Sequence, residues 1–144
     1  MTKPLVSIIT PCYNGEAFLK RYFESILNQT YPNLELIFIN DGSTDRTEEI
    51  ALSYRERLEK RGITYIYEKQ ENAGQAAALN RGLKLFTGEY LTWPDSDDEM
   101  VSDAVEKKVD YLEQHPDYGF CICKTKVVNE NNPEMKCGYY ERMK

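Results

Sequence analysis

The sequence predicts an α/β fold, with a mostly parallel sheet covered by helices on both faces, in one domain over residues 1–144. Short apolar segments rich in β-branched residues alternate with longer segments in which apolar residues recur every three or four positions. The first kind fits strands buried on both faces, and the second fits amphipathic helices. Their regular alternation favours a parallel sheet, and 144 residues suit a single hydrophobic core.

The first part of the chain contains two strand–helix units. A strand is predicted over residues 5–10, and Asn14 is a candidate N-cap for the helix that follows. The inner face of that helix would carry Phe18, Leu19, Tyr22, Phe23, Ile26 and Leu27. A second strand is predicted over residues 34–40. The next helix starts near Asp45, which has capping-box spacing to Glu48, and Gly62 stops it.

The rest of the chain continues the pattern. Strands are predicted over residues 63–67 and 90–93, with a helix over 74–86 between them that Gly88 ends. A further helix is predicted over 102–114, with Pro116 just past its end, and a fifth strand over 120–128. After Asn129 the chain becomes polar, and we expect a loop or a frayed end there.

The charge distribution excludes some partners. The chain has a net charge of −6, and residues 89–117 alone hold ten acids against two lysines. No basic stripe is present, so nucleic acid is not an expected partner. No apolar run is long enough to span a bilayer, and the N-terminus lacks a signal-peptide pattern. We therefore expect a cytoplasmic location, with the inner face of the membrane as an alternative.

The four cysteines do not form a recognisable metal or redox motif. Cys121 and Cys123 alternate along the predicted strand over 120–128, so they would share one face of it. No CxxC pair occurs, and His115 is the only histidine, although a structural zinc site needs four good ligands. We expect reduced and partly buried thiols.

Polar and turn-forming residues follow the first, second and fourth predicted strands. The three segments are TPCYNG (residues 10–15), DGSTD (41–45) and DSDD (95–98). In a parallel sheet the carboxyl ends of the strands open on one edge, and ligands bind at that edge near a switch point. The sequence therefore predicts a pocket formed by these three loops.

The acids of this predicted pocket point to a metal. In an extended segment Asp95 and Asp97 would lie on the same side, and two such carboxylates suit Mg²⁺ or Mn²⁺. A divalent cation would offset their repulsion, bridge to a diphosphate and stabilise charge as that group leaves. Asp41, at a strand end, is placed to accept hydrogen bonds from a ribose or base, and Tyr13 could stack on a base.

Other interpretations of the same residues exist. A lone D-x-D arises often by chance, and Asp41 with its neighbours could form only a turn. Asp98 and Glu99 could open the following helix, where acids complement the dipole, and we favour that role for them. A calcium loop starting at Asp95 fails, because Met100 stands where glycine is needed. P-loop and dinucleotide glycine motifs are absent.

Taken in order, these segments resemble the family 2 glycosyltransferases, whose donor domain has the nucleotide-diphospho-sugar transferase (GT-A, Rossmann-like) architecture. The similar stretches are VSIITPCYNGEAFLKRYFESILNQTYPNLELIFINDGSTDRT and ENAGQAAALNRGLKLFTGEYLTWPDSDD, within residues 4–125. The resemblance implies a metal site with Mn²⁺ or Mg²⁺ at Asp97 and Asp95. It implies nucleotide-binding roles for Pro11, Tyr13, Asp41, Asn72, Gly74, Gln75, Asp95 and Ser96.

The same resemblance implies a function. The enzyme would be metal-dependent and inverting, transferring a sugar from a nucleotide-diphospho-sugar, first of all a UDP-sugar, to an unknown acceptor in cell-surface polysaccharide or glycoconjugate synthesis. Family members continue beyond this length, so we expect residues 1–144 to be the N-terminal, donor-binding portion. The general base is expected beyond Lys144, and no catalytic residue is assigned.

Two alternatives to this function remain at the level of sequence. One is a non-catalytic nucleotide- or metal-binding module, which the unassigned base favours. The other is a sugar-phosphate nucleotidyltransferase, which shares the fold type but usually carries a basic, glycine-rich loop after its first strand. The corresponding loop here, PCYNGE, has no lysine or arginine. A homo-oligomer is also conceivable if a sheet edge is left exposed.

Overall fold

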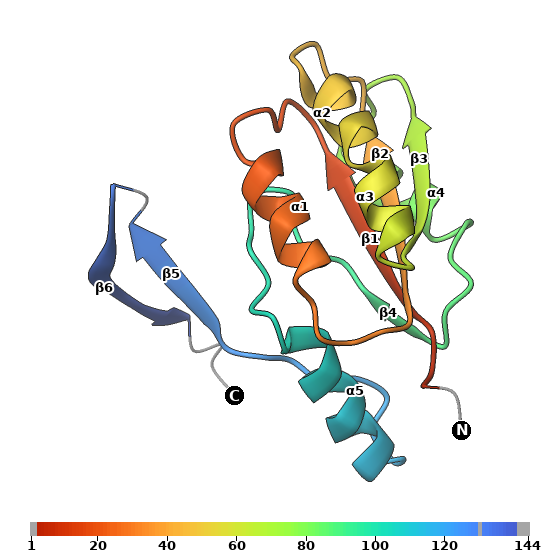
Figure 1. The fold of residues 1–144 in the computed structure, drawn as a ribbon, viewed down its shortest axis with the longest axis vertical. Coiled ribbons are helices and arrows are strands. Elements are labelled where there is room, and N and C mark those ends of the chain that lie inside the picture. Colours follow the sequence, from red (N-terminus) through yellow and green to blue (C-terminus); the bar gives the residue numbers. More distant parts are fainter. Residues whose placement is uncertain (1–2, 130, 141–144) are drawn as a thin grey trace. The chain divides into compact units, whose positions relative to one another are not determined.

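A computed structural model describes residues 3–129 and 131–140, which divide into two compact units, one ending at Lys107 and one beginning at Lys108. The first unit contains a four-stranded sheet made of β1 (Val6–Cys12), β2 (Leu34–Asn40), β3 (Thr64–Lys69) and β4 (Tyr90–Thr92). All neighbouring strands are parallel, in the order β3-β2-β1-β4 (Figure 1). The predicted parallel α/β sheet is confirmed.

One face of this sheet packs against α4 (Gln75–Gly82). The core there contains Ile9, Ile37 and Ile39 from the two central strands and Ala78 from the helix, all completely buried. The helix approaches β1 closely, because a side chain at Gly82 would overlap Ile9. Glycine at this position therefore lets the helix bury the apolar face of the central strands.

The opposite face packs against α1 (Leu19–Leu27), α2 (Thr47–Ser53) and α3 (Arg55–Lys60). Phe23 of α1 is the centre of an aromatic cluster: its ring lies 5.5 Å from Phe38 of β2 and stacks on Tyr54 at 4.6 Å. Tyr22 is also buried, and its hydroxyl lies 2.5 Å from the Thr10 hydroxyl. Helices thus cover both faces, as predicted, because consecutive strand residues point to opposite sides.

Several predicted helix boundaries are wrong. Asn14 does not cap α1, which begins only at Leu19; Asn14 lies in the preceding loop with a φ of 51°. The single helix predicted from Asp45 is two short helices that meet at Tyr54. The capping box is also absent, because Glu48 pairs with Lys69 of β3 instead. For Asn14 and Glu48, a tertiary partner competes with the local helix signal.

The helices around β4 also differ from the prediction. α4 ends at Gly82 rather than Phe86, since the chain turns there and the N–H groups of Leu85 and Phe86 both donate to the Gly82 carbonyl. α5 (Ala104–Gln114) begins two residues late. Buried Gln29 explains this start, because it donates to the Val101 carbonyl and accepts from the Val105 N–H. It thereby satisfies one free N–H of the first helical turn.

The second unit contains the end of α5 and a two-stranded antiparallel sheet of β5 (Thr125–Asn129) and β6 (Asn132–Tyr140). The predicted strand over 120–128 forms only from Thr125, so Cys121 and Cys123 lie outside it and share no strand face. The predicted loop after Asn129 is also wrong, because β6 pairs with β5 in an antiparallel sheet despite a polar sequence. In the described residues, no helix is long and apolar enough to cross a bilayer.

Candidate functional site

A cavity of about 370 Å³ opens at the carboxyl ends of β1, β2 and β4. The strand order reverses between β1 and β4, which makes this edge the topological switch point of the sheet. The lining residues come from the end of β1, from the three loops after these strands and from the start of α4: Pro11, Cys12, Tyr13, Asn14, Gly15, Phe18, Asp41, Gln75, Asp95, Ser96 and Asp97. The predicted convergence of the three loops is confirmed.

Most of the residues expected to bind a ligand line this cavity. The exceptions are Asn72 and Gly74, which lie in the loop before α4 and support the wall from behind. Cys12, Asn14 and Gly15 belong to the TPCYNG segment that was predicted to form the pocket but were given no ligand role, and Phe18 was expected only on the inner face of a helix. Cys12 ends β1 and the other three lie between β1 and α1, so their closeness to Pro11 and Tyr13 in the chain was the available signal.

Asp41 holds the loop that leads into α4. Its carboxylate is buried and accepts hydrogen bonds from the Gln70 side chain at 2.7 Å and from the N–H groups of Ala73 and Gly74 at 2.9 Å. Burial alone would raise the pKa of Asp41, but these three hydrogen bonds outweigh it, so its pKa lies below the ordinary value. Asp41 is therefore a fixed anion on the cavity wall that also supports its neighbours.

The loops after β1 and β2 are joined by side-chain to backbone hydrogen bonds. We call residues 13–16 and 43–47 the loop clamp. The N–H groups of Asn14, Gly15 and Glu16 donate, at 2.9–3.0 Å, to the side chains of Ser43, Thr47 and Asp45 respectively. In return, the Thr44 N–H donates to Asn14 Oδ1 and the Arg46 N–H to Glu16 Oε2.

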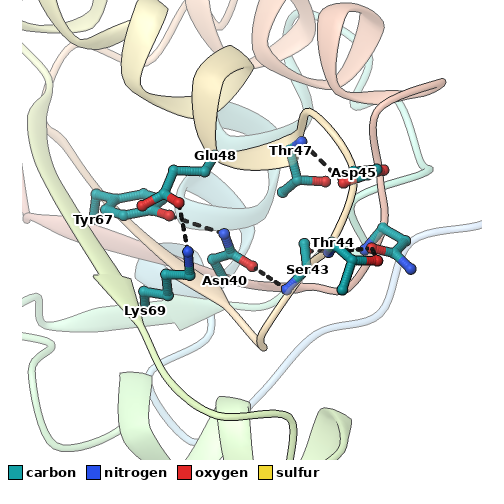
Figure 2. A network of polar contacts seen from close by, with 9 residues as sticks. Asn40, Ser43, Thr44, Asp45, Thr47, Glu48, Tyr67 and Lys69 are labelled. Carbon is teal, nitrogen blue, oxygen red and sulfur yellow. Dashed lines mark hydrogen bonds and ion pairs between the residues drawn. The ribbon is translucent and has the colours of Figure 1, made fainter.

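The clamp is tied to β3 through Asn40, which is completely buried at the end of β2. Asn40 Oδ1 accepts from the Ser43 N–H at 2.9 Å, and its Nδ2 donates to the Tyr67 hydroxyl at 2.9 Å (Figure 2). The Lys69–Glu48 ion pair lies beside Tyr67 in the same network. The side chains of the DGSTD segment therefore shape one wall of the cavity from behind.

The opposite side of the cavity is a turn over Asp95–Asp98, the acidic turn. The Asp98 N–H donates to the Asp95 carbonyl at 3.2 Å, so the expectation of an extended segment is wrong. Asp95 and Asp97 nevertheless both line the cavity, and Asp95 Oδ1 accepts from Gln75 Nε2 at 2.8 Å. Partial burial, followed by repulsion from Asp97 and Asp95, raises the pKa of Asp98.

The second pair of acids lies outside the helix they were predicted to start. Asp98 and Glu99 precede α5, which begins at Ala104, and Glu99 pairs with Arg21 of α1 at 3.3 Å. Segment 98–103 is instead held against α1 by Gln29 and by the Ser25 hydroxyl, which accepts from the Met100 N–H. The dipole argument therefore does not apply to these two acids.

The donor set at the acidic turn fits a shared metal. Among residues 3–129 and 131–140, no group of three or more histidines, cysteines and acids could hold a metal ion by itself. Asp95 and Asp97 supply only carboxylate oxygens, which Mg²⁺ and Mn²⁺ accept, and these ions commonly complete their coordination with substrate phosphates. The residues present therefore suit a cation that arrives with a phosphorylated ligand.

Comparisons with known proteins agree with this geometry. Residues 7–142 match the description "Glycosyl transferase family 2". An uncharacterized glycosyltransferase of Haemophilus influenzae is 42% identical over 127 residues, covering 84% of this chain and 50% of the relative. A putative teichuronic acid biosynthesis glycosyltransferase, TuaG of Bacillus subtilis, is 37% identical over 110 residues, covering 76% and 42%. The chain spans half or less of the length of the curated relatives it matches.

Solved structures share the fold. Staphylococcus aureus TarS in complex with UDP-GlcNAc has a TM-score of 0.71 at 26% identity, over 78% of this chain and 32% of that one. The mannosyltransferase PcManGT of Pyrobaculum calidifontis, in complex with GDP-Man and Mn²⁺, has a TM-score of 0.70 at 30% identity, over 78% and 33%. With the family match covering nearly the whole chain, these findings show that the chain belongs to glycosyltransferase family 2 and has the GT-A fold.

Proposed function

We propose that this chain forms the donor-binding part of a metal-dependent, inverting glycosyltransferase that uses a nucleotide-diphospho-sugar. The observation that carries the proposal is the cavity at the switch point, which combines an exposed aromatic ring, a buried carboxylate and a pair of exposed carboxylates. These three features match the parts of such a donor: a flat base, a ribose and a diphosphate. The UDP-GlcNAc and GDP-Man complexes of the two structural neighbours support this class of ligand.

The nucleoside would lie between the loop after β1 and Asp41. Tyr13 is 53% exposed at the cavity, so its ring face is available to stack on a base. Asp41 is ionised and held by three donors, and its remaining lone pairs would accept hydrogen bonds from the base or ribose. Pro11, Gln75 and Ser96 would complete the contacts around the nucleotide.

The diphosphate would lie at the acidic turn. Asp97 and Asp95 would hold Mn²⁺ or Mg²⁺, a role supported by the Mn²⁺ in the PcManGT complex. Such a cation offsets negative charge on the leaving diphosphate. In a direct displacement, the acceptor hydroxyl loses its proton to the general base and its oxygen bonds to the anomeric carbon as the bond to the diphosphate breaks, which inverts that carbon. Gln75, which bonds Asp95, would orient the carboxylate.

The loop clamp argues against a nucleotidyltransferase. A triphosphate-binding loop offers free backbone N–H groups to the phosphates. Here the N–H groups of Asn14, Gly15 and Glu16 already donate to protein side chains. The acceptor proposed for the whole enzyme is a growing cell-surface polysaccharide or another glycoconjugate, a proposal supported by the name of the TuaG relative.

The test is thermal stabilisation of the chain by nucleoside diphosphates. UDP and GDP are added with Mn²⁺, with Mg²⁺ or with EDTA to the wild-type chain and to Asp97→Ala. Asp117→Ala, at an exposed acid that is not among the cavity-lining residues, serves as a matched control. A ligand that binds the native state raises the melting temperature. We expect a rise with UDP that requires both the cation and Asp97. A rise that is the same with EDTA would contradict metal dependence, and no rise with either nucleotide would contradict the proposed function.

A further inference from the structure

We propose that Asn14 is a positioning residue that holds Tyr13 in place at the nucleotide cavity. The loop clamp supports Asn14 and so affects the affinity for the ligand. The inference rests on the proposed function, because it assigns a role within the nucleotide-binding wall. It also gives the clamp, whose members Ser43, Asp45 and Thr47 do not line the cavity, a part in binding.

No hydrogen bond or ring stacking within the described residues fixes the side chain of Tyr13. The ring is 53% exposed, and among the described residues no side chain hydrogen-bonds to it or stacks on it. The backbone at residues 13 and 14 therefore sets the point from which the Tyr13 ring projects. A base gains more from stacking when the ring is already near its bound position, because ordering a free side chain on binding costs entropy.

Asn14 fixes that backbone in an uncommon conformation. It is the only described residue other than glycine with a positive φ, at 51°. Asparagine enters this left-handed region more easily than most residues, but it still needs local support. Two bonds of the clamp give that support: the Asn14 N–H donates to Ser43 Oγ at 3.0 Å, and Asn14 Oδ1 accepts from the Thr44 N–H at 2.9 Å.

The support for Asn14 is itself anchored in the core. Ser43 and Thr44 belong to a turn that buried Asn40 holds from the end of β2. Asn40 in turn bonds Tyr67 of β3 (Figure 2). An unbroken series of hydrogen bonds thus connects the sheet to the backbone beside Tyr13. The geometry makes the placement of the ring a property of the folded core rather than of the loop alone.

The experiment measures the affinity of UDP, with Mn²⁺, by calorimetry for the full chain and four variants: Tyr13→Ala, Asn14→Ala, the double variant, and Asn14→Asp. Loss of a stacked base is worth about tenfold or more in affinity, so we expect that loss for Asn14→Ala. We expect Asn14→Asp, which keeps the acceptor oxygen, to stay within about threefold of the wild type. In the Tyr13→Ala background, Asn14→Ala should have almost no further effect, because coupled residues are not additive.

A second pair of variants avoids any direct contact with the ligand. Ser43 does not line the cavity, so Ser43→Ala tests the clamp alone, and we expect a loss of about threefold for a single weakened support. Ser53→Ala is the matched control, since Ser53 is an exposed helix residue whose hydroxyl, within the described part of the chain, donates only to the Ile50 carbonyl. Melting temperatures without ligand separate loss of affinity from loss of folding. If Asn14→Ala does not fold, the UDP affinities of Asn14→Asp and Ser43→Ala test the positioning role instead.

Three results would overturn the inference. Equal losses for Asn14→Ala in both backgrounds would mean that Asn14 touches the ligand itself. Unchanged affinity in Asn14→Ala, with UDP bound normally by the wild type, would remove the positioning role and leave the proposed function intact. If the wild type binds neither UDP nor GDP, the proposed function fails, and the inference fails with it.

Discussion

The loop clamp and the acidic turn border the same cavity but are held by different interactions. In the clamp, backbone N–H groups of one loop donate to side chains of the other, and the β1 and β2 residues behind it are buried throughout. The acidic turn follows β4, whose three residues are only partly buried, and Asp95 and Asp97 are exposed. The wall at the loop clamp is therefore held by hydrogen bonds within the protein. The wall at the acidic turn carries negative charge that the protein does not neutralise.

Under the proposed function, the two walls would bind different parts of the donor. A rigid wall suits the base and ribose, because a site formed in advance saves the entropy of ordering it on binding. Repelling carboxylates suit the metal and diphosphate, because these ligands themselves supply the compensating charge. Three changes, taken from the largest expected effect on folding stability to the smallest, test whether the two walls differ in this way.

The largest effect is expected on the clamp side, for Gly42→Ala. Gly42 has a φ of +74°, and a Cβ there would lie 2.7 Å from the backbone nitrogen of Asn72. Backbone strain together with this overlap should lower the free energy of unfolding by about 3 kcal/mol. Urea denaturation measures it. Gly62→Ala is the control, since Gly62 has a similar φ of +88° with nothing within 4 Å, and it should lose about 1 kcal/mol.

If the two glycine variants lose the same free energy of unfolding, the loop at Asn72 moves away from the added Cβ without an energetic cost. The wall around Asp41 would then be less rigid than the hydrogen bonds indicate, and the contrast with the acidic turn would weaken.

An intermediate and pH-dependent effect is expected for Asp41→Asn. The carboxylate accepts hydrogen bonds at both of its oxygens, whereas the amide can accept at only one. The variant should therefore lose about 2 kcal/mol of unfolding free energy at neutral pH. Because the folded pKa of Asp41 is lowered, the wild-type carboxylate stabilises the fold above about pH 4 and loses that advantage as the pH falls through the folded pKa.

The measurement is the urea midpoint of both proteins between pH 2 and pH 7. The gap between wild type and Asp41→Asn should be constant above about pH 5 and close as the pH falls. A gap that is independent of pH would show that the charge of Asp41 contributes nothing and that only its shape matters.

The smallest effect on stability is expected at the acidic turn, for Asp97→Asn. Asp97 is exposed and its removal relieves repulsion, so the free energy of unfolding without metal should change by less than about 0.5 kcal/mol. Asp117→Asn, an exposed acid outside the cavity, is the charge-matched control. A loss above 1 kcal/mol would make Asp97 a structural residue and remove the contrast between the two walls.

The fold was largely predictable from the sequence where burial dominates. The strand segments around Ile9, Ile37 and Ile66 carry apolar residues on both faces, which leaves a central parallel sheet as the favoured arrangement. Helix boundaries were less predictable, since Gln29 accepts from the first turn of α5 and Glu48 forms an ion pair with Lys69 instead of capping α2. These partners are distant in sequence, and no local pattern encodes them. The hairpin of β5 and β6 was missed for the same reason.

The sequence by itself determined that the acids, Tyr13 and Asp41 follow strand ends, because strand burial and turn chemistry are local properties. Only the tertiary structure decided that the DGSTD segment holds the loop of Asn14 and that Asp41 carries three donors. It also decided that the acids sit on a turn rather than an extended strand. The physical reason is that a hydrogen bond between distant segments depends on how the sheet aligns them. In the sequence, the residues that form such a bond cannot be distinguished from ordinary turn residues.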